Sequence, residues 1–427
     1  MAGILLITAG GRVLGFFREV LISSQYGTTP PADAFFTIQQ LPTIVSTFVF
    51  GPFMIAYVPY YAAMRTSGIE RKAVEDSSRA ALRFGVAITA VMIGVGVVLL
   101  WLNIGPAGGQ GLYGSFTVIL ALSIVPLIVT GLASVVLNAR GQHVAAMAIA
   151  ALTPAGLLAC LILLTVLPIV SSADALPWSF VAGSVLSAVV GVIVLRRSLP
   201  AAPADAPTAR PPDSATFRKE LLASAAENVG FSLNQALTVF FAAGLGGGVV
   251  ATYSYAYRIT AFAFGLVSPL NIWIQTWMTR DESHREGRLL LLVITAMAAL
   301  VVGIAIALIV VAGPLVAFVY LRGSFSEANA ASVTAVLTPL AVYGVVFSLN
   351  HLFARYWFVQ LQGAIYSRVM IAAYVIGNLL KAVMVGPFGL DGVIWASVIA
   401  EGAALAWFSV HVLRRARSAG PAGARPE

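Results

Sequence analysis

The sequence predicts an all-α polytopic membrane protein, with about 12 transmembrane helices in two six-helix bundles around a central cavity. The first observation is composition: hydrophobic residues make up 59% of the 427 residues and charged residues only 10%, against about 25% charged residues in soluble domains. The second is length, because twelve spans of about 22 residues each would use most of the apolar residues. The third is an internal repeat. The composition excludes a soluble enzyme, a nucleic-acid-binding module and a disordered chain.

Apolar windows define the individual spans, each long enough to cross the hydrocarbon core as a helix. A polar, Pro/Ala-rich segment at 198–216 is predicted to be a cytoplasmic linker between an N-terminal bundle at 1–197 and a C-terminal bundle at 217–414. A basic tail follows at 415–427. The predicted spans are 2–23, 34–62, 80–103, 113–138, 145–169, 177–196, 217–243, 250–278, 288–320, 331–357, 364–386 and 391–413.

The loops between the spans alternate in charge, which sets the predicted orientation. Most Lys and Arg lie in one alternating set of loops, which includes 65–79 and 279–288, whereas four loops of the other set contain none. Basic loops stay in the cytoplasm, so both termini are predicted to be cytoplasmic. This topology explains the net charge of +8, and only Arg322 and Lys381 are placed near the outer side.

The two halves of the chain resemble each other. Trp178 and the Arg pair at 196–197 recur as Trp395 and the Arg pair at 414–415, at offsets of 217 and 218 residues. An even number of spans in each half gives both halves the same orientation, so they are predicted to be parallel repeats, as in transporters that move two bundles around a cavity. Chance recurrence of these residues at membrane edges is the alternative interpretation.

Several ionisable residues fall inside the predicted spans, where a charge is costly and usually faces a cavity or a partner. The three arginines of this set favour an anionic ligand, because guanidinium groups suit phosphate oxygens. Arginines that reach the membrane interface are the structural alternative. The two carboxylates that stand apart from them are candidate proton or cation sites, with simple interfacial placement as the alternative. The residues are Arg12, Arg18 and Glu19 in the first span, Glu227 in the seventh, Arg258 in the eighth and Glu401 in the twelfth.

Other chemistry finds little support in the sequence. Cys160 lies in an apolar run and the four His are scattered, so neither a disulfide framework nor a metal site is predicted. No hydrolytic or redox constellation is present, so the chain is not expected to be an enzyme. No cofactor is expected, and a coupling Na⁺ or H⁺ is the one small ion considered.

The first two predicted helices resemble those of the MurJ/MviN family, bacterial flippases for lipid-linked cell-wall precursors in a superfamily that includes multidrug and polysaccharide exporters. The matching pieces are RVLGFFRE at 12–19, ADAFF at 32–36, YSYAYRI at 253–259, LRGSF at 321–325 and GLDGVIWASVIAE at 389–401. The family carries charges midway along its second span and has two more helices, whereas this chain has an uncharged stretch at 46–53 and twelve predicted spans.

The resemblance implies site residues. It implies that Arg12, Arg18, Asp33 and Arg258 bind the substrate's pyrophosphate or gate the cavity, with Asp33 at the outer mouth of the second span. It also implies an ion site that includes Asn234, with Asn378 as a partner. Together with Glu227 and Glu401, these two residues form the predicted ion-coupling set.

Three functions follow as hypotheses. The first is a flippase that moves a polyprenyl-(pyro)phosphate-linked cell-wall precursor, lipid II or a related glycolipid, across the bacterial cytoplasmic membrane by alternating access. The second is a proton- or sodium-coupled multidrug exporter on the same scaffold. The third is a non-transporting scaffold that recruits cell-wall synthesis proteins. The expected partners are the glycolipid, the bilayer and cell-wall synthesis proteins, and no nucleic acid.

Overall fold

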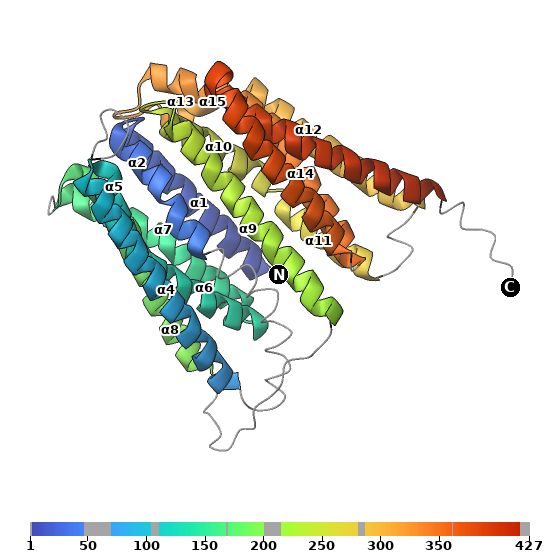
Figure 1. Ribbon diagram of the computed structural model, residues 1–427, viewed down its shortest axis with the longest axis horizontal. Coiled ribbons are helices and arrows are strands. Elements are labelled where there is room, and N and C mark those ends of the chain that lie inside the picture. Colours follow the sequence, from blue (N-terminus) through green and yellow to red (C-terminus); the bar gives the residue numbers. More distant parts are fainter. Residues whose placement is uncertain are drawn as a thin grey trace. The chain divides into compact units, whose positions relative to one another are not determined.

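The computed structural model describes residues 2–46, 70–103, 111–167, 170–199, 215–280, 287–360 and 362–418. Within these ranges all regular secondary structure is helical (Figure 1). The later part of the predicted second span, the central part of the predicted linker and the end of the basic tail lie outside the described residues. The predicted all-α fold class is confirmed.

The chain divides into two compact units, and the first comprises residues 1–236, 246–251 and 322–325. In this unit α7 packs closely on α8 through glycines, since a Cβ built on Gly183 would lie 2.4 Å from the carbonyl oxygen of Thr153. The helices of this unit are α1 (Ala2–Tyr26), α2 (Pro30–Ile38), α4 (Glu70–Trp101), α5 (Leu112–Ala121), α6 (Ile124–Ala139), α7 (His143–Val166), α8 (Ser172–Ser198) and most of α9 (Ala215–Ala243).

Two short segments from late in the sequence complete the first unit. In the segment 322–325 the backbone N–H of Ser324 donates to the carbonyl oxygen of Ser24 at the end of α1, at 2.8 Å. Gly323 adopts φ +57, and a Cβ there would lie 2.3 Å from the same carbonyl oxygen, so only glycine fits this close approach. The other segment, 246–251, meets the start of α2 and is described below.

The second unit comprises residues 237–245, 252–321 and 326–427. Its last helix, α15, contains a non-helical residue, Gly389, with φ 58 and ψ −137. The turn separates two apolar helices, in agreement with the predicted spans 364–386 and 391–413. The helices of this unit are most of α10 (Val249–Gly265), then α11 (Ser268–Arg280), α12 (Gly287–Val310), α13 (Ala312–Tyr320), α14 (Glu327–Val359) and α15 (Gly363–Ser418).

Seven helical segments among the described residues are long and apolar enough to cross a membrane. Their outer faces carry large apolar side chains, such as Trp101, Val310 and Val383, which are 72–83% exposed. Such surface is unfavourable in water and suited to lipid. The chain is therefore a multipass membrane protein, as predicted. The segments are Ser78–Trp101, Leu112–Ala139, His143–Val166, Ser172–Ser198, Leu289–Val310, Glu327–Val359 and Gly363–Arg414.

Candidate functional site

Asp33 caps the start of α10 within the first unit. Its side chain is 3% exposed, and its Oδ1 accepts a hydrogen bond from the backbone N–H of Ala251 at 2.7 Å. Its Oδ2 accepts another from the backbone N–H of Gly248. The first N–H groups of a helix have no partner inside that helix, and a carboxylate there also interacts favourably with the helix dipole. Asp33 therefore fixes the beginning of the helix that carries Arg258.

Local sequence explains why these groups can meet. Pro30 and Pro31 occupy the first positions of α2, where proline is favoured, and Asp33 follows in the first turn. Gly248 adopts φ +87, and a Cβ there would lie 3.0 Å from the carbonyl oxygen of Thr28. Glycine is required at this position by both the backbone conformation and the close approach.

Burial also changes the acidity of Asp33, which precedes the predicted span at 34–62 and lies outside the membrane-spanning segments. Removing the carboxylate from water disfavours its charged form. Burial therefore raises the pKa of Asp33 from its ordinary value of 3.8 to about 6, although the hydrogen bonds from Ala251 and Gly248 act in the opposite direction. Desolvation outweighs the two hydrogen bonds.

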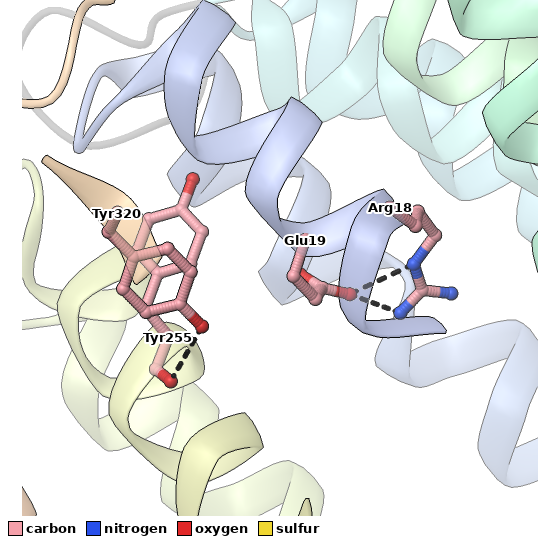
Figure 2. Close-up of polar contacts among 4 residues, drawn as sticks. All are labelled: Arg18, Glu19, Tyr255 and Tyr320. Carbon is pink, nitrogen blue, oxygen red and sulfur yellow. Dashed lines mark hydrogen bonds and ion pairs between the residues drawn. The ribbon is translucent and has the colours of Figure 1, made fainter. Parts of the chain in front are cut away.

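Arg18 and Glu19 form an ion pair on α1, in the first unit, in which two guanidinium nitrogens contact one carboxylate oxygen (Figure 2). The Arg18 Nε donates to Glu19 Oε1 at 2.9 Å, and Nη2 contacts the same oxygen. Both side chains are nearly buried, at 12% and 4% exposure. The carboxylate therefore balances the arginine charge and fixes the direction of the guanidinium group. Arg12 lies earlier on the same helix, and its side chain lies outside the structural description.

Arg258 lies in the second unit on α10, directly after three alternating tyrosines. The rings of Tyr253 and Tyr257 stack with centroids 5.8 Å apart. Tyr255 is fully buried, and its carbonyl oxygen accepts a hydrogen bond from the hydroxyl of Tyr320 on α13 at 3.2 Å (Figure 2). Tyr255 therefore belongs to the packing between α10 and α13, and Arg258, which follows Tyr257 in the sequence, is half-buried.

Glu401 lies in the interior of the second unit, with 1% exposure. Its Oε1 accepts a hydrogen bond from the Tyr343 hydroxyl at 3.2 Å, and its backbone oxygen accepts one from the Asn350 side chain at 3.1 Å. These contacts join α15 to α14. Glu401 is therefore part of a buried polar network.

The same unit contains a buried cation that was not among the predicted site residues. Lys381, predicted to lie near the outer side, has a side chain with 0% exposure. Its Nζ donates to Thr238 Oγ1 on α9 at 2.8 Å and to Asn378 Oδ1 at 3.1 Å. A signal was present in the sequence: Lys381 follows Asn378 by three residues in an otherwise apolar run, so both lie on one face of a helix.

The remaining predicted ion-coupling residues lie on α9, in the part of that helix that belongs to the first unit. Asn234 is buried, with 2% exposure, and Glu227 is half-buried. No group of three or more His, Cys, Asp or Glu with metal-binding geometry occurs in the part of the chain that the structure describes. Ion coupling through Glu227, Asn234, Asn378 and Glu401 stays a prediction.

Comparison with known proteins identifies the family. The family model described as lipid II flippase MurJ matches residues 22–424, nearly the whole chain. The chain belongs to the lipid II flippase MurJ family. Asp33, Arg258 and Lys381 lie inside the matched range, whereas Arg12 and Arg18 precede it.

Individual MurJ relatives match only part of this chain. A probable lipid II flippase MurJ from Vibrio cholerae is 32% identical over 118 residues, which cover 24% of this chain and 22% of that protein. The match therefore spans about a fifth of the length of this curated relative.

Solved structures of the MurJ family and of a related transporter family share the fold. A lipid II flippase MurJ in an inward closed conformation superposes with a TM-score of 0.77 and 15% identity, covering 97% of this chain and 88% of that one. An inward-facing multidrug resistance MATE family transporter gives a TM-score of 0.74 and 15% identity, covering 96% of each chain. At this identity the similarity establishes the transporter fold alone.

Proposed function

We propose that the chain is a flippase that moves a polyprenyl-(pyro)phosphate-linked cell-wall precursor across the bacterial cytoplasmic membrane by alternating access. Lipid II is the substrate that the family's name specifies. The observation that carries the proposal is the match of the MurJ family model to residues 22–424. The alternation of basic loops supports an orientation with both termini in the cytoplasm.

The arginines supply the chemistry that such a substrate needs. In the proposal, Arg12, Arg18 and Arg258 bind the phosphates, because guanidinium groups form charge-assisted hydrogen bonds with phosphate oxygens in a medium of low dielectric. The ion pair with Glu19 holds the Arg18 guanidinium in one direction, which lowers the ordering cost of binding.

Asp33 acts on Arg258 through the helix that carries it. Asp33 accepts a hydrogen bond from the backbone N–H of Ala251. Arg258 lies seven residues after Ala251, which corresponds to about two turns of helix. In the proposal Asp33 is a positioning residue that fixes the start of α10, and does not itself contact the phosphates.

Replacement of the native flippase tests the proposal. Cells depleted of their own lipid II flippase should grow when they express this chain, and lipid II should disappear from the inner leaflet. Native mass spectrometry of the purified protein should detect a co-purified polyprenyl-linked lipid. Failure to restore growth, combined with no bound polyprenyl lipid in protein shown to be folded, would contradict it.

Drug export is a weaker candidate because similarity to the MATE transporter extends only to the fold. The proposed cavity arginines also disfavour cationic drugs, since like charges repel strongly at low dielectric. We expect no change in the minimum inhibitory concentration of cationic drugs when the chain is expressed in a strain lacking its own exporters.

A further inference from the structure

The interior of the second unit contains a buried lysine ammonium group. Lys381 has 0% exposure, and its Nζ donates to two neutral oxygens, Thr238 Oγ1 at 2.8 Å and Asn378 Oδ1 at 3.1 Å. Thr238 lies on α9 and the other two residues on α15. The lysine therefore joins two helices that are far apart in the sequence.

A carboxylate lies within electrostatic range of this charge. Glu401 interacts electrostatically with Lys381, although the two residues lie on opposite sides of the turn at Gly389. The two helices of α15 pack closely at this level, because a Cβ built on Gly377 would lie 3.3 Å from the Cβ of Ala400. Gly377 precedes Asn378 and Ala400 precedes Glu401, so both polar residues directly follow the point of close approach.

The groups around the ammonium are those that bind a small monovalent cation. Hydroxyl, amide and carboxylate oxygens are typical ligands of hard cations, and transporters bind coupling Na⁺ with such oxygens near the bilayer midplane. An ammonium group has three donors and no acceptor, so it satisfies the same oxygens. Because a buried charge is costly without partners, an ammonium and a solution cation would compete for one set of oxygens.

We propose that the Lys381 ammonium is a built-in cation that occupies the site formed by the Thr238 and Asn378 oxygens, with Glu401 as a nearby counter-charge, in place of a monovalent cation from solution. The site is then satisfied throughout the transport cycle without an ion from the medium. Sodium coupling through Asn378 and Glu401 is replaced by a permanent internal charge pair. The consequence for transport rests on the proposed function, but occupation of the site does not.

Thermal unfolding of the purified full-length chain tests the occupation directly. Melting temperatures are compared in NaCl and in choline chloride at equal ionic strength, for the wild type, Lys381→Ala, Lys381→Met and the double variant Lys381→Ala/Glu401→Gln. Lys381→Ala removes the ammonium and leaves room beside the oxygens, whereas Lys381→Met removes the charge but fills most of the space.

We expect no sodium-specific shift in the wild type. Loss of the ammonium should lower the melting temperature in choline chloride by roughly 5–15 °C in both single variants, because the Glu401 charge loses its counter-charge. NaCl should restore part of the stability of Lys381→Ala in a saturable way, but not that of Lys381→Met or the double variant.

A saturable sodium-specific stabilisation of the wild type would overturn the proposal, and so would a Lys381→Met variant that melts like the wild type. If Lys381→Ala cannot be purified, the wild-type and Lys381→Met measurements still decide. None of these measurements requires transport, so failure of the chain to replace a lipid II flippase would leave this inference standing, and its failure would leave the flippase proposal intact.

Discussion

The carboxylate of Asp33 accepts a hydrogen bond of 2.7 Å from the backbone N–H of Ala251, and the two residues are 218 positions apart in the sequence. Both residues belong to the first unit, in which the short segment 246–251 meets the start of α2. A single buried side chain therefore sets where α10 begins. The chemistry proposed for Arg258 depends on that start point.

Substitution of Asp33 should separate its hydrogen bonding from its charge. Asp33→Ala removes both acceptors of the α10 cap and should abolish replacement of a native flippase, at a stability cost of about 1–2 kcal/mol. Asp33→Asn keeps one acceptor and should retain partial activity. Growth of flippase-depleted cells measures the effect, with membrane levels of each variant as a check.

Asp174 provides the matched control for this substitution. It also lies in the first turn of a helix, α8, but it bonds only locally, with Ser171. Asp174→Ala should therefore leave growth unchanged. Equal losses in the Asp33 and Asp174 variants would show that any helix-start carboxylate has this effect.

The pH dependence of stability should report the buried state of Asp33. Its pKa is about 6 in the folded chain and 3.8 ordinarily, so between these values the folded form holds a proton that the unfolded form has lost. The contribution of this group to stability is therefore largest below about pH 4 and declines as the pH rises to about 6. The melting temperature of the wild type minus that of Asp33→Asn should decline over this window and then level off. A difference independent of pH would contradict the burial argument.

Loss of Arg18 or Arg258 should stop transport but leave the amount of protein in the membrane unchanged. Arg18→Ala and Arg258→Ala remove groups proposed to bind phosphate. Arg18→Lys should restore little transport, since an ammonium cannot form the paired N–H contacts that a guanidinium makes with phosphate oxygens. Arg79→Ala is the control, because the Arg79 side chain is 67% exposed and its Nη2 lies 3.9 Å from Glu75 Oε2. A surface ion pair at this distance contributes little to stability. Wild-type flipping by Arg18→Ala or Arg258→Ala would refute these assignments.

Sequence predicted the class of fold because hydropathy is an additive property that each segment shows by itself. The two helices of α15 and the apolar spans from α4 to α8 follow directly from it. Contacts between side chains could not be predicted from the sequence in the same way. Helix spacing predicts which residues share a face, but it does not predict that the long Arg18 side chain bends back to its sequence neighbour Glu19. The contacts of Lys381 were not predicted, because its partner Thr238 lies on another helix, and the sequence alone does not show which helices are neighbours.

Adjacent glycines allow a test of the loop before α10. Gly248→Ala would force a side chain into a left-handed conformation, φ +87, and against the Thr28 carbonyl oxygen. We expect a loss of about 1–3 kcal/mol, seen as a lower melting temperature. Gly247→Ala should be nearly neutral, because a Cβ at Gly247 meets nothing within 4 Å. Similar melting temperatures for the two variants would argue against a strained loop.

The first unit draws its residues from three separate stretches of the chain, 1–236, 246–251 and 322–325. A cut in the predicted linker at 198–216 would leave Asp33 on one polypeptide and both of its N–H donors on the other. Ser24 would likewise be separated from Ser324. An isolated N-terminal fragment therefore lacks pieces that complete its own unit, whereas every residue of the second unit lies after the linker, so the two halves are not equivalent modules.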